Sequence, residues 1–425
     1  MNKKILILGG GTGGTLTANR LARHAKRDAL EVTVVDKSDT HMYQPALLFV
    51  PFGDADPGDI IKGRREQLKS NVEYIESDID RVDVEMNQVF LEDGRKLDYD
   101  VLVVATGAIL TPGETEGLLG PGWGQNVFTF YDLEGAVGLR GALEGFTHGK
   151  ILIDIVDMPI KCPVAPLEFA FLADAYFAKR GIREDVSISY ATPLDAAFTK
   201  PEASRHLGGM FANRGIELIT GFNAGEVDEV GRKLIGFDGR ELEYDLLVTI
   251  PLHAGADYVG RSYKLGDEFN FVPTDAKTLQ SKVAPNIFVI GDAAGIPVSK
   301  AGSVAHFEGE VLVPNILAFL RNEPFKEIFD GHANCFIETG HNKALLIDFN
   351  TETEPLEGHF PGPFGLPLLK ESYLNHLGKL AFEQMYWHVL LPGHDIPLVG
   401  SKMPSVGKHR LSVTTISDRD DVAVR

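Results

Sequence analysis

The sequence predicts an α/β protein with two domains built on parallel sheets and a C-terminal, partly amphipathic helical extension. Three observations lead to this fold class. A glycine-rich loop joins a strand to a helix near the N-terminus, a second succession of strands and helices begins near residue 149, and a helical pattern with one apolar side follows residue 370. Strands that alternate with helices are typical of parallel sheets covered by helices.

The first domain begins with a strand, a glycine-rich loop and a helix. A short apolar strand over 4–8 leads into Gly9-Gly10-Gly11-Thr12-Gly13-Gly14, which contains G-x-G-x-x-G. Gly9 allows the tight turn, Gly11 lets the backbone approach a pyrophosphate, and Gly14 permits close packing of the helix. The next strand, over 31–35, ends at Asp36, which would accept hydrogen bonds from ribose hydroxyls. This Rossmann-like unit is expected to bind a dinucleotide through Gly9, Gly11, Thr12, Gly13, Gly14, Asp36 and Lys37.

Two later segments indicate by resemblance that the dinucleotide is FAD. Residues 99–107 resemble the strand and A-T-G turn of two-dinucleotide-domain flavoproteins of the glutathione reductase type, and residues 286–294 resemble their second flavin signature. In such proteins the aspartate of that signature, here Asp292, binds the ribityl chain, although a helix-capping role is also open. A helix expected after 298 would point its N-terminus at the pyrimidine edge of the flavin. The resemblance implies FAD, held also by Ala105, Thr106, Gly107, Gly291, Asp292, Lys300 and Gly302.

The second domain repeats the alternation of strands and helices but lacks a phosphate-binding loop. Strands are expected over 149–156, 186–190, 216–220 and 245–250, and a helix over 167–179. The loop over 157–166, between the first strand and that helix, holds three prolines and no glycine. Because proline lacks an N–H and glycine's freedom in φ is absent, this loop cannot build the usual pyrophosphate cradle. The domain is therefore expected to keep a Rossmann-like fold without an NAD(P) site.

The chain has two cysteines, Cys162 in the proline-rich loop and Cys335 beyond the second flavin signature. Two cysteines are too few for a disulfide scaffold, so a disulfide between them is expected to be redox-active rather than structural. They also cannot form a zinc site by themselves, and no metal is expected. The alternative is a pair of buried, inert thiols.

These features together resemble the sulfide:quinone oxidoreductase family. The residues that carry the resemblance are Tyr43-Gln44-Pro45, Ile160-Lys161-Cys162-Pro163, the segment 300–306 and Cys335. The resemblance implies an FAD-dependent oxidoreductase in which Cys162 and Cys335 are catalytic and oxidise sulfide to sulfane sulfur or polysulfide, with electrons passing through the flavin to a membrane quinone. Cys335 is expected nearer the flavin, although the reverse is open. Many members carry a third cysteine where this chain has residues 124–129 without one, which suggests the type III branch.

The resemblance also implies a quinone site and proton carriers. Phe336 and Phe349 are candidates for stacking on the quinone ring, with Tyr43 a weaker one. The candidate proton carriers are Glu168, His206, His332 and His341. Glu168 could equally serve as a first-turn partner of its helix dipole.

Three other functions are open. A type II NADH:quinone oxidoreductase has the same fold but would need a glycine-rich loop near Asp157. The thiol pair could instead oxidise a persulfide, a polysulfide or a selenium compound. A flavin-binding subunit that docks a partner such as a cytochrome would hold a flavin that neither sulfide nor cysteine substitution affects.

The expected domain boundaries are 1–115 and 270–345 for the FAD-binding domain, 116–269 for the second domain and 346–425 for the extension. The extension contains a helical pattern with an apolar side formed by Tyr373, Leu374, Leu377, Leu380, Ala381 and Met385. Such a helix lies in a membrane interface, or packs on the body or on a partner subunit. The resemblance favours the membrane interface, close to the quinone.

Composition limits the partners and the location. A net charge of −19 argues against nucleic acid, whose phosphates require Lys and Arg. No run approaches the roughly 18 apolar residues of a membrane-spanning helix, and the N-terminus leads directly into a strand without a secretory signal pattern. The chain is therefore expected at the cytoplasmic side as a peripheral membrane protein, with a homo-oligomer possible.

Overall fold

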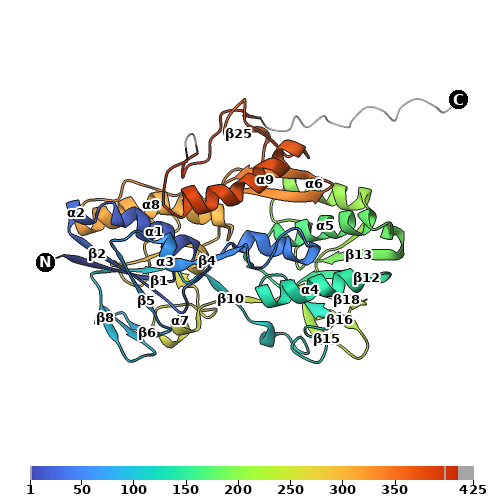
Figure 1. The fold of residues 1–425 in the computed structure, drawn as a ribbon, viewed down its shortest axis with the longest axis horizontal. Helices are drawn as coiled ribbons and strands as arrows, with labels where there is room; N and C mark the ends of the chain where they lie inside the picture. The colour runs from blue at the N-terminus through green and yellow to red at the C-terminus, as the bar shows by residue number, and fades with distance from the viewer. Residues whose placement is uncertain (1, 397–398, 410–425) are drawn as a thin grey trace.

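A computed structural model describes residues 2–396 and 399–409 and confirms the α/β fold with two parallel sheets (Figure 1). The first sheet has the order β21-β9-β1-β2-β5, and all its neighbouring strands are parallel. Its strands are β1 (Lys3–Leu8), β2 (Leu30–Asp36), β5 (Val72–Glu76), β9 (Val101–Val104) and β21 (Ile287–Val289). The carboxyl ends of parallel strands share one edge, so the loops at Gly9, Asp36, Ala105 and Gly291 meet there.

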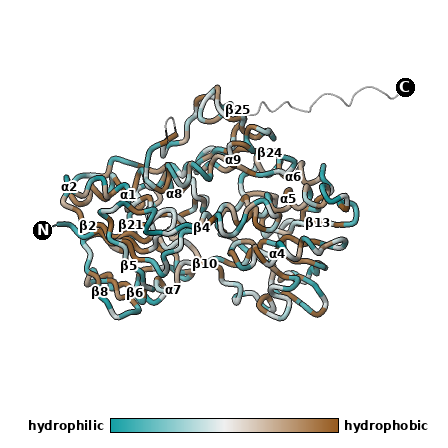
Figure 2. Tube along the Cα trace, in the orientation of Figure 1, coloured by the Kyte–Doolittle hydropathy of each residue, from teal (hydrophilic) through white to brown (hydrophobic). Residues whose placement is uncertain are grey.

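Burial on both faces explains the composition of the central strands. Every residue of β9, with the sequence Val-Leu-Val-Val, is buried. Helices α1 (Thr12–Ala22) and α8 (Gly302–Leu320) pack against each other above the sheet (Figure 1). Figure 2 shows hydrophobic residues concentrated around β2 and β21. Continuous apolar strands of this kind are typical of a parallel sheet covered by helices.

The second parallel sheet has the order β11-β18-β12-β13-β14. Its strands are β11 (Val127–Phe128), β12 (Gly149–Ile155), β13 (Val186–Ala191), β14 (Ile216–Ile219) and β18 (Leu246–Ile250), and its helices are α4 (Leu133–Gly145), α5 (Ala165–Lys179) and α6 (Pro201–Asn213). An antiparallel pair, β10 (Ala108–Leu110) with β19 (His253–Gly255), joins the two domains. The proline-rich loop therefore runs from the carboxyl end of β12 to α5, which begins two residues before the helix expected from the sequence.

A hairpin carrying Cys335 connects the two domains with the C-terminal extension. Its strands β23 (Ala333–Gly340) and β24 (Lys343–Phe349) contact α5 and α8, and α9 (Tyr373–Met385) packs across them. In Figure 1, α9 lies over the junction of the two domains. The boundary expected between residues 345 and 346 falls inside β24, because the hairpin packs as one unit that the sequence pattern could not assign to either side.

The remaining elements are short. They are α2 (Ala25–Asp28), β3 (Thr40–Met42), η1 (Gln44–Leu48), η2 (Val50–Phe52), β4 (Ile61–Gly63), α3 (Arg64–Gln67), β6 (Ile79–Asp83), β7 (Gln88–Leu91), β8 (Lys96–Asp98), η3 (Pro112–Glu114), η4 (Arg183–Asp185), β15 (Ala224–Asp228), β16 (Lys233–Gly236), β17 (Glu241–Glu243), α7 (Asp257–Arg261), β20 (Val272–Pro273), η5 (Gly291–Ala293), β22 (Ala294–Gly295), β25 (Glu357–Phe360), β26 (Leu366–Leu368), the π-helical turn η6 (Tyr386–Leu390) and β27 (Lys408–His409).

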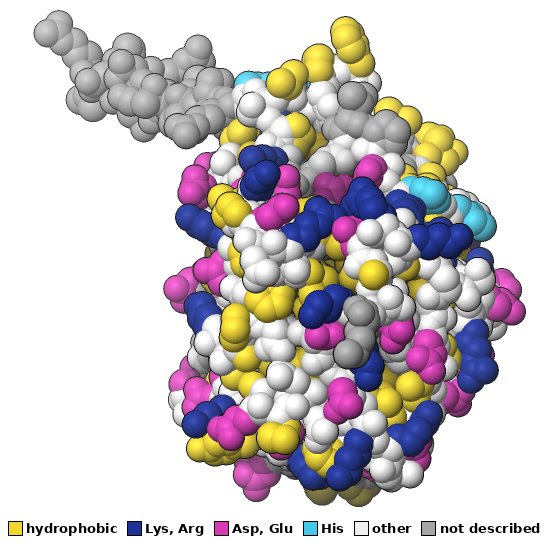
Figure 3. Space-filling view, turned by 90° about the vertical axis from the view of Figure 1, so that its left-hand side faces the viewer, with side chains coloured by type: hydrophobic (Ala, Val, Ile, Leu, Met, Phe, Trp, Pro, Cys, Tyr) yellow, Lys and Arg dark blue, Asp and Glu magenta, His cyan; other side chains and the backbone are white. Residues whose placement is uncertain are grey.

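The outer face of α9 is apolar and exposed. Tyr373, Leu374, Leu377 and Leu380 are between 42% and 60% exposed, and Phe364 in the preceding segment is fully exposed. Figure 3 shows hydrophobic side chains projecting at the top of the molecule, above a face on which charges of both signs are interspersed. Among the described residues, no helix combines the length and the apolar character needed to cross a bilayer.

A buried carboxyl lies in the second sheet, at Asp154 of β12. Burial raises the pKa of Asp154 to about 8, and Thr249 Oγ1 donates to one of its oxygens at 3.3 Å. The other carboxylate oxygen finds no protein partner among the described residues. Such a carboxyl favours the folded state in its protonated form, so this contribution to stability is present below its ordinary pKa of about 4 and is lost as the pH rises through about 8.

Replacing Asp154 with asparagine is expected to remove this pH dependence. The melting temperature of the wild type should fall relative to that of Asp154→Asn by several degrees between about pH 5 and pH 9. Thermal unfolding of both proteins across this range measures the difference. If the difference in melting temperature between the two proteins were the same at every pH, Asp154 would have an ordinary pKa in the folded protein.

Candidate active site

A cavity of about 600 Å³ extends from the edge of the first sheet to the second domain and α9. Its wall includes Cys162 and thirteen of the fourteen residues expected to bind the cofactor. Those thirteen are Gly9, Gly11, Thr12, Gly13, Asp36, Lys37, Ala105, Thr106, Gly107, Gly291, Asp292, Lys300 and Gly302. Gly14 lies behind the loop, and Cys335 lies outside this wall. Segments far apart in the sequence therefore converge on one site.

The glycine-rich loop has the geometry that a dinucleotide requires. Gly9 has a φ of +94°, and a Cβ atom on Gly14 would lie 1.8 Å from the carbonyl oxygen of Gly9. A Cβ on Gly11, which lines the cavity, would meet no protein atom within 4 Å. Gly9 therefore serves the turn and Gly14 serves the packing of α1, whereas Gly11 leaves open space for a phosphate group.

Replacing Gly14 with alanine is expected to prevent FAD binding, because the new methyl group cannot avoid the backbone of Gly9 without moving the loop. The purified variant should be colourless, with FAD affinity lowered by about a hundredfold or more, since several kcal/mol of steric strain oppose the bound conformation. Gly141→Ala is the matched control, because a Cβ on that residue of α4 meets nothing within 4 Å. Normal flavin content in Gly14→Ala would disprove the role given to this glycine.

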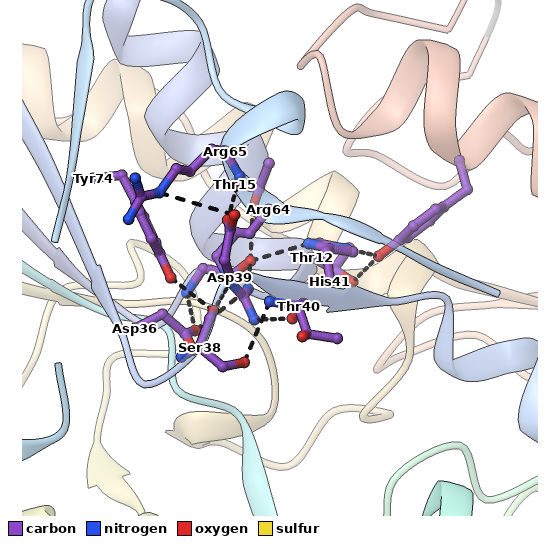
Figure 4. A network of polar contacts seen from close by, with 12 residues as sticks. Thr12, Thr15, Asp36, Ser38, Asp39, Thr40, His41, Arg64, Arg65 and Tyr74 are labelled. Carbon is purple, nitrogen blue, oxygen red and sulfur yellow. Dashed lines mark hydrogen bonds and ion pairs between the residues drawn. The ribbon is translucent and has the colours of Figure 1, made fainter. Parts of the chain in front are cut away.

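At the adenosine end of the cavity, Asp36 is held by the loop and by Arg64 (Figure 4). One Asp36 oxygen accepts from the Gly10 N–H at 2.6 Å and lies 3.3 Å from the Arg64 guanidinium. Arg64 is buried and also donates to the carbonyls of Gly10, Ser38 and Thr40. The sequence analysis did not identify Arg64, and no motif marks it, since its role depends on a turn that brings α3 onto the loop.

At the opposite end, the N-terminus of α8 faces the cavity. The N-cap residue, Ala301, makes no side-chain capping bond, and Gly302 lines the cavity. Unpaired N–H groups at a helix N-terminus stabilise negative charge, as the pyrimidine edge of a reduced flavin requires. Lys300 is buried beside them and donates to the carbonyl oxygens of Asp292 (2.8 Å) and Ala294 (3.0 Å). The loop, the acidic residue and this helix end together fit FAD in an extended form.

Cys162 lies on the cavity wall in a constrained conformation. Its φ is +45°, in the left-handed region that residues other than glycine rarely adopt. Its N–H donates to Lys300 O at 2.6 Å, and its carbonyl accepts from the Ala165 N–H (2.9 Å) and from the Tyr131 hydroxyl (3.1 Å). Backbone strain that neighbouring bonds hold in place is typical of functional sites. The loop that lacks a phosphate cradle therefore presents a thiol to the cavity.

Both cysteines are free thiols and are partly accessible. Burial raises the pKa of Cys162 to about 12, with a further rise from the charge of Glu168 and an opposing effect of Lys379. Burial also raises the pKa of Cys335, and the charge of Cys162 is the largest of the charges that add to this rise. Both cysteine segments reach the start of α8, since the Cys162 N–H donates to Lys300 O at 2.6 Å and Ser303 Oγ donates at 2.7 Å to the carbonyl of Asn334, the residue before Cys335. Cys162 lies on the cavity wall and Cys335 lies outside it.

A buried ion pair lies beside the cysteines. Lys379 of α9 contacts Glu168 of α5 at 2.7 Å and also donates to Phe336 O at 3.2 Å. The same Glu168 oxygen accepts from the Glu338 N–H at 2.8 Å, and the Glu338 carboxylate contacts His376 at 2.9 Å. Burial raises the pKa of Glu168, and Lys379 opposes this. Glu168 and Lys379 both line the cavity, so this pair sets the local charge at Cys162.

The other candidates from the sequence lie elsewhere. Phe336, Phe349 and Tyr43 are not part of the cavity wall, and His206 and His341 are exposed on the surface. His332 is fully buried and contacts Asp348 and Gly400 O. The aromatic side chains on the wall are those of Phe130, Tyr131, Tyr258, Phe382 and Tyr386. The spacing of Lys379 and Phe382, at i and i+3, was a sequence signal that they share one face of α9, and Tyr386 follows at i+7 as the first residue of η6.

Known proteins are similar to this chain over most of its length. Residues 3–143 match the family described as Pyridine nucleotide-disulphide oxidoreductase. The mitochondrial sulfide:quinone oxidoreductase of Mus musculus is 28% identical over 403 residues, covering 92% of this chain and 87% of the mouse protein. The sulfide-quinone reductase of Aquifex aeolicus is 26% identical, covering 95% of this chain and 94% of that protein.

The solved structure of the Aquifex aeolicus sulfide:quinone oxidoreductase has the same fold, with a TM-score of 0.78, 22% identity and 92% coverage of both chains. A type II NADH:quinone oxidoreductase of Haemophilus influenzae is 25% identical over 91% of this chain and 94% of its own length. These likenesses confirm the resemblance that the sequence motifs indicate. The chain therefore has the fold of a two-dinucleotide-domain FAD oxidoreductase, and over about nine-tenths of its length it is similar to the sulfide:quinone oxidoreductases.

Proposed function

We propose that this flavoprotein oxidises sulfide through Cys162 and Cys335 and transfers the electrons to a quinone. The observation that carries the proposal is the constrained Cys162 thiol, which lies on the wall of the FAD cavity where a nicotinamide-binding domain would have its phosphate loop. The Cys335 strand and the Cys162 loop both make hydrogen bonds at the start of α8. Curated relatives named sulfide:quinone oxidoreductase over nine-tenths of the chain support the same chemistry.

The sulfur steps are thiol–disulfide exchange between the two cysteines. HS⁻ attacks one sulfur of a Cys162–Cys335 disulfide, so the S–S bond breaks, one cysteine becomes a persulfide and the other becomes a thiolate. Closure of the persulfide sulfur onto that thiolate forms a trisulfide and releases a proton and two electrons. The sulfide sulfur is thereby oxidised to sulfane sulfur. The free thiols of the structure are the reduced form of the pair.

The residues around the cysteines control charge during this exchange. Lys379 stabilises a thiolate at Cys162, whereas Glu168 disfavours one. Glu168 can also take up the released proton, because burial raises its pKa. Its contacts with Lys379 and the Glu338 N–H keep the carboxyl group beside Cys162.

FAD bound in this cavity would supply the acceptor for the electron pair and the means of its transfer to the quinone. The glycine-rich loop and Asp36 would hold its adenosine diphosphate part, and Asp292 and the N-terminus of α8 would hold the flavin end, since all of them line the cavity. Phe382 of α9, one turn from Lys379, lines the cavity and is our candidate for contact with a quinone. We propose peripheral membrane association through the exposed apolar face of α9, which would bring a membrane quinone to this end of the cavity. A homo-oligomer and a position at the cytoplasmic side remain predictions from the sequence.

The electron donor distinguishes the proposed sulfide:quinone activity from the alternative NADH:quinone activity. Purified protein is mixed with a soluble quinone and either sulfide or NADH, and quinone reduction is followed by absorbance. Sulfide is expected to support turnover, and NADH to support less than about one hundredth of that rate, because the loop after β12 has no glycine for a pyrophosphate. Turnover with NADH and none with sulfide would reject the proposal.

A further inference from the structure

Tyr386 connects the C-terminal extension to the FAD cavity. It is the first residue of η6, the π-helical turn that continues α9, and its side chain is 2% exposed. It lines the cavity together with Thr12, the first residue of α1. A π-helical turn is less stable than an α-helical one and is frequently found at functional sites. Here it turns Tyr386 and Trp387 inward, where both are buried.

The Tyr386 hydroxyl belongs to a short chain of hydrogen bonds shown in Figure 4. It lies 2.8 Å from Thr12 Oγ1 and 2.7 Å from His41 Nε2, and His41 Nδ1 lies 3.1 Å from Gly10 O. Burial lowers the pKa of His41 to about 3, so the ring is neutral. Since a carbonyl only accepts, His41 Nδ1 carries the proton and Nε2 is an acceptor.

The direction of every bond in the chain follows from this tautomer. Tyr386 donates to His41 Nε2, and its oxygen accepts from the Thr12 hydroxyl. The chain therefore starts at Thr12 and returns to Gly10, both in the glycine-rich loop. Gly10 O also accepts from the Thr15 hydroxyl at 2.8 Å. The C-terminal extension thus fixes the hydroxyl orientation of a loop residue on the cavity wall.

Packing around Tyr386 also holds the C-terminal extension against the domain that contains the glycine-rich loop. Its ring lies 4.8 Å from that of Tyr43, and the Trp387 ring lies 5.5 Å from that of His41. Asn19 of α1 donates to Leu391 O at 2.7 Å. At its other end α9 is joined to the Cys335 hairpin through backbone bonds between Ser372 and Ala344. One helix therefore spans the distance from the loop to the hairpin, with Lys379 on the cavity wall between them.

We propose that Tyr386 couples FAD binding to the docking of α9, so that the cofactor holds the C-terminal helix in place and the docked helix holds the cofactor. Two segments that share one hydrogen-bonded chain stabilise each other, and linkage makes the effect reciprocal. This coupling goes beyond sulfide oxidation, because it concerns cofactor retention and the position of the helix that carries Lys379 and Phe382. It can be tested without any substrate.

The first test is the affinity of the FAD-free full-length protein for FAD. Tyr386→Phe keeps the ring but removes the donor to His41 and the acceptor for Thr12, and it is expected to raise the FAD Kd about tenfold. Tyr373→Phe, on the same helix but 60% exposed, is the matched control and should bind FAD like the wild type. If Tyr386→Phe also binds within about twofold of the wild type, the proposal is wrong.

The second test measures the docking of α9 by amide hydrogen exchange of residues 373–391 with and without FAD. FAD is expected to slow exchange in the wild type and to have a clearly smaller effect in Tyr386→Phe. If Tyr386→Phe does not fold, Thr12→Val, which breaks the chain at its other end, takes its place, and the wild-type comparison stands by itself. Exchange of α9 that is unaffected by FAD in the wild type would overturn the coupling.

Discussion

Replacing Cys162 with alanine is expected to lower the rate of sulfide-dependent flavin reduction by about a thousandfold or more, because the nucleophilic thiol is lost. FAD should stay bound, since the Cys162 contacts with Lys300, Ala165 and Tyr131 use backbone atoms that alanine retains. Rapid anaerobic mixing with sulfide measures the rate, and the visible flavin spectrum reports cofactor content.

Cys335→Ala should produce a loss of similar size, because Cys162 then has no partner with which to form the disulfide that sulfide attacks. The isosteric Cys162→Ser variant separates the loss of the sulfur atom from the loss of volume and should be as inactive as Cys162→Ala. A variant at either cysteine that reduces its flavin at the wild-type rate would remove that residue from the mechanism.

Neutralising Glu168 is expected to make Cys162 much more reactive. Burial raises the pKa of this thiol to about 12, and the Glu168 charge is the next cause of the rise. Glu168→Gln removes that charge and leaves the ammonium of Lys379 beside the sulfur, so the pKa of Cys162 should fall by about one to two units. The rate of alkylation at a fixed, mildly alkaline pH should then rise at least tenfold or so.

The measurement is the pH dependence of alkylation in a Cys335→Ala background, so that only Cys162 reacts. Glu202→Gln is the matched control, because Glu202 is also a first-turn glutamate but belongs to α6, away from the cavity. Superimposable pH profiles for Glu168→Gln and its parent would show that Glu168 does not control the thiol.

Removing Lys379, the ion-pair partner of Glu168, is expected to have a different outcome. In Lys379→Met, Glu168 loses its counter-ion and takes up a proton, so Cys162 gains no reactivity. Removing one partner of a buried ion pair also costs about 3–5 kcal/mol of stability, so the melting temperature should fall clearly. Lys150→Met, which breaks the exposed pair with Glu243, should leave the melting temperature nearly unchanged.

The sequence was sufficient to predict features that depend on local chain geometry. The G-x-G-x-x-G loop, the acidic residue at the end of β2 and the proline-rich loop each follow from the backbone requirements of a few consecutive residues. Their convergence on one cavity follows from the parallel sheet, whose strand ends share an edge. The residues expected from these motifs accordingly lie on the cavity wall, except Gly14, whose role is packing.

The features that the sequence did not reveal depend on contacts between distant segments. Arg64 reaches Gly10 across 54 positions, and Tyr386 reaches His41 across 345. The expectation that Cys335 lies nearer the flavin, with the reverse open, rested on resemblance and stays a prediction. Cys162 is the cysteine on the cavity wall. The apolar side of α9 was visible in the sequence, but the inward positions of Lys379 and Phe382 require knowing that the helix packs over the Cys335 hairpin.

The measurement that tests the central claim most directly is the visible absorbance of the bound flavin under anaerobic conditions as sulfide is added, with NADH added to a separate sample. Bleaching by sulfide, no bleaching by NADH, and recovery of the oxidised spectrum on addition of a soluble quinone are the expected results. A flavin that NADH reduces and sulfide does not would contradict the account, and one that neither reduces would point to another donor or to a docking subunit.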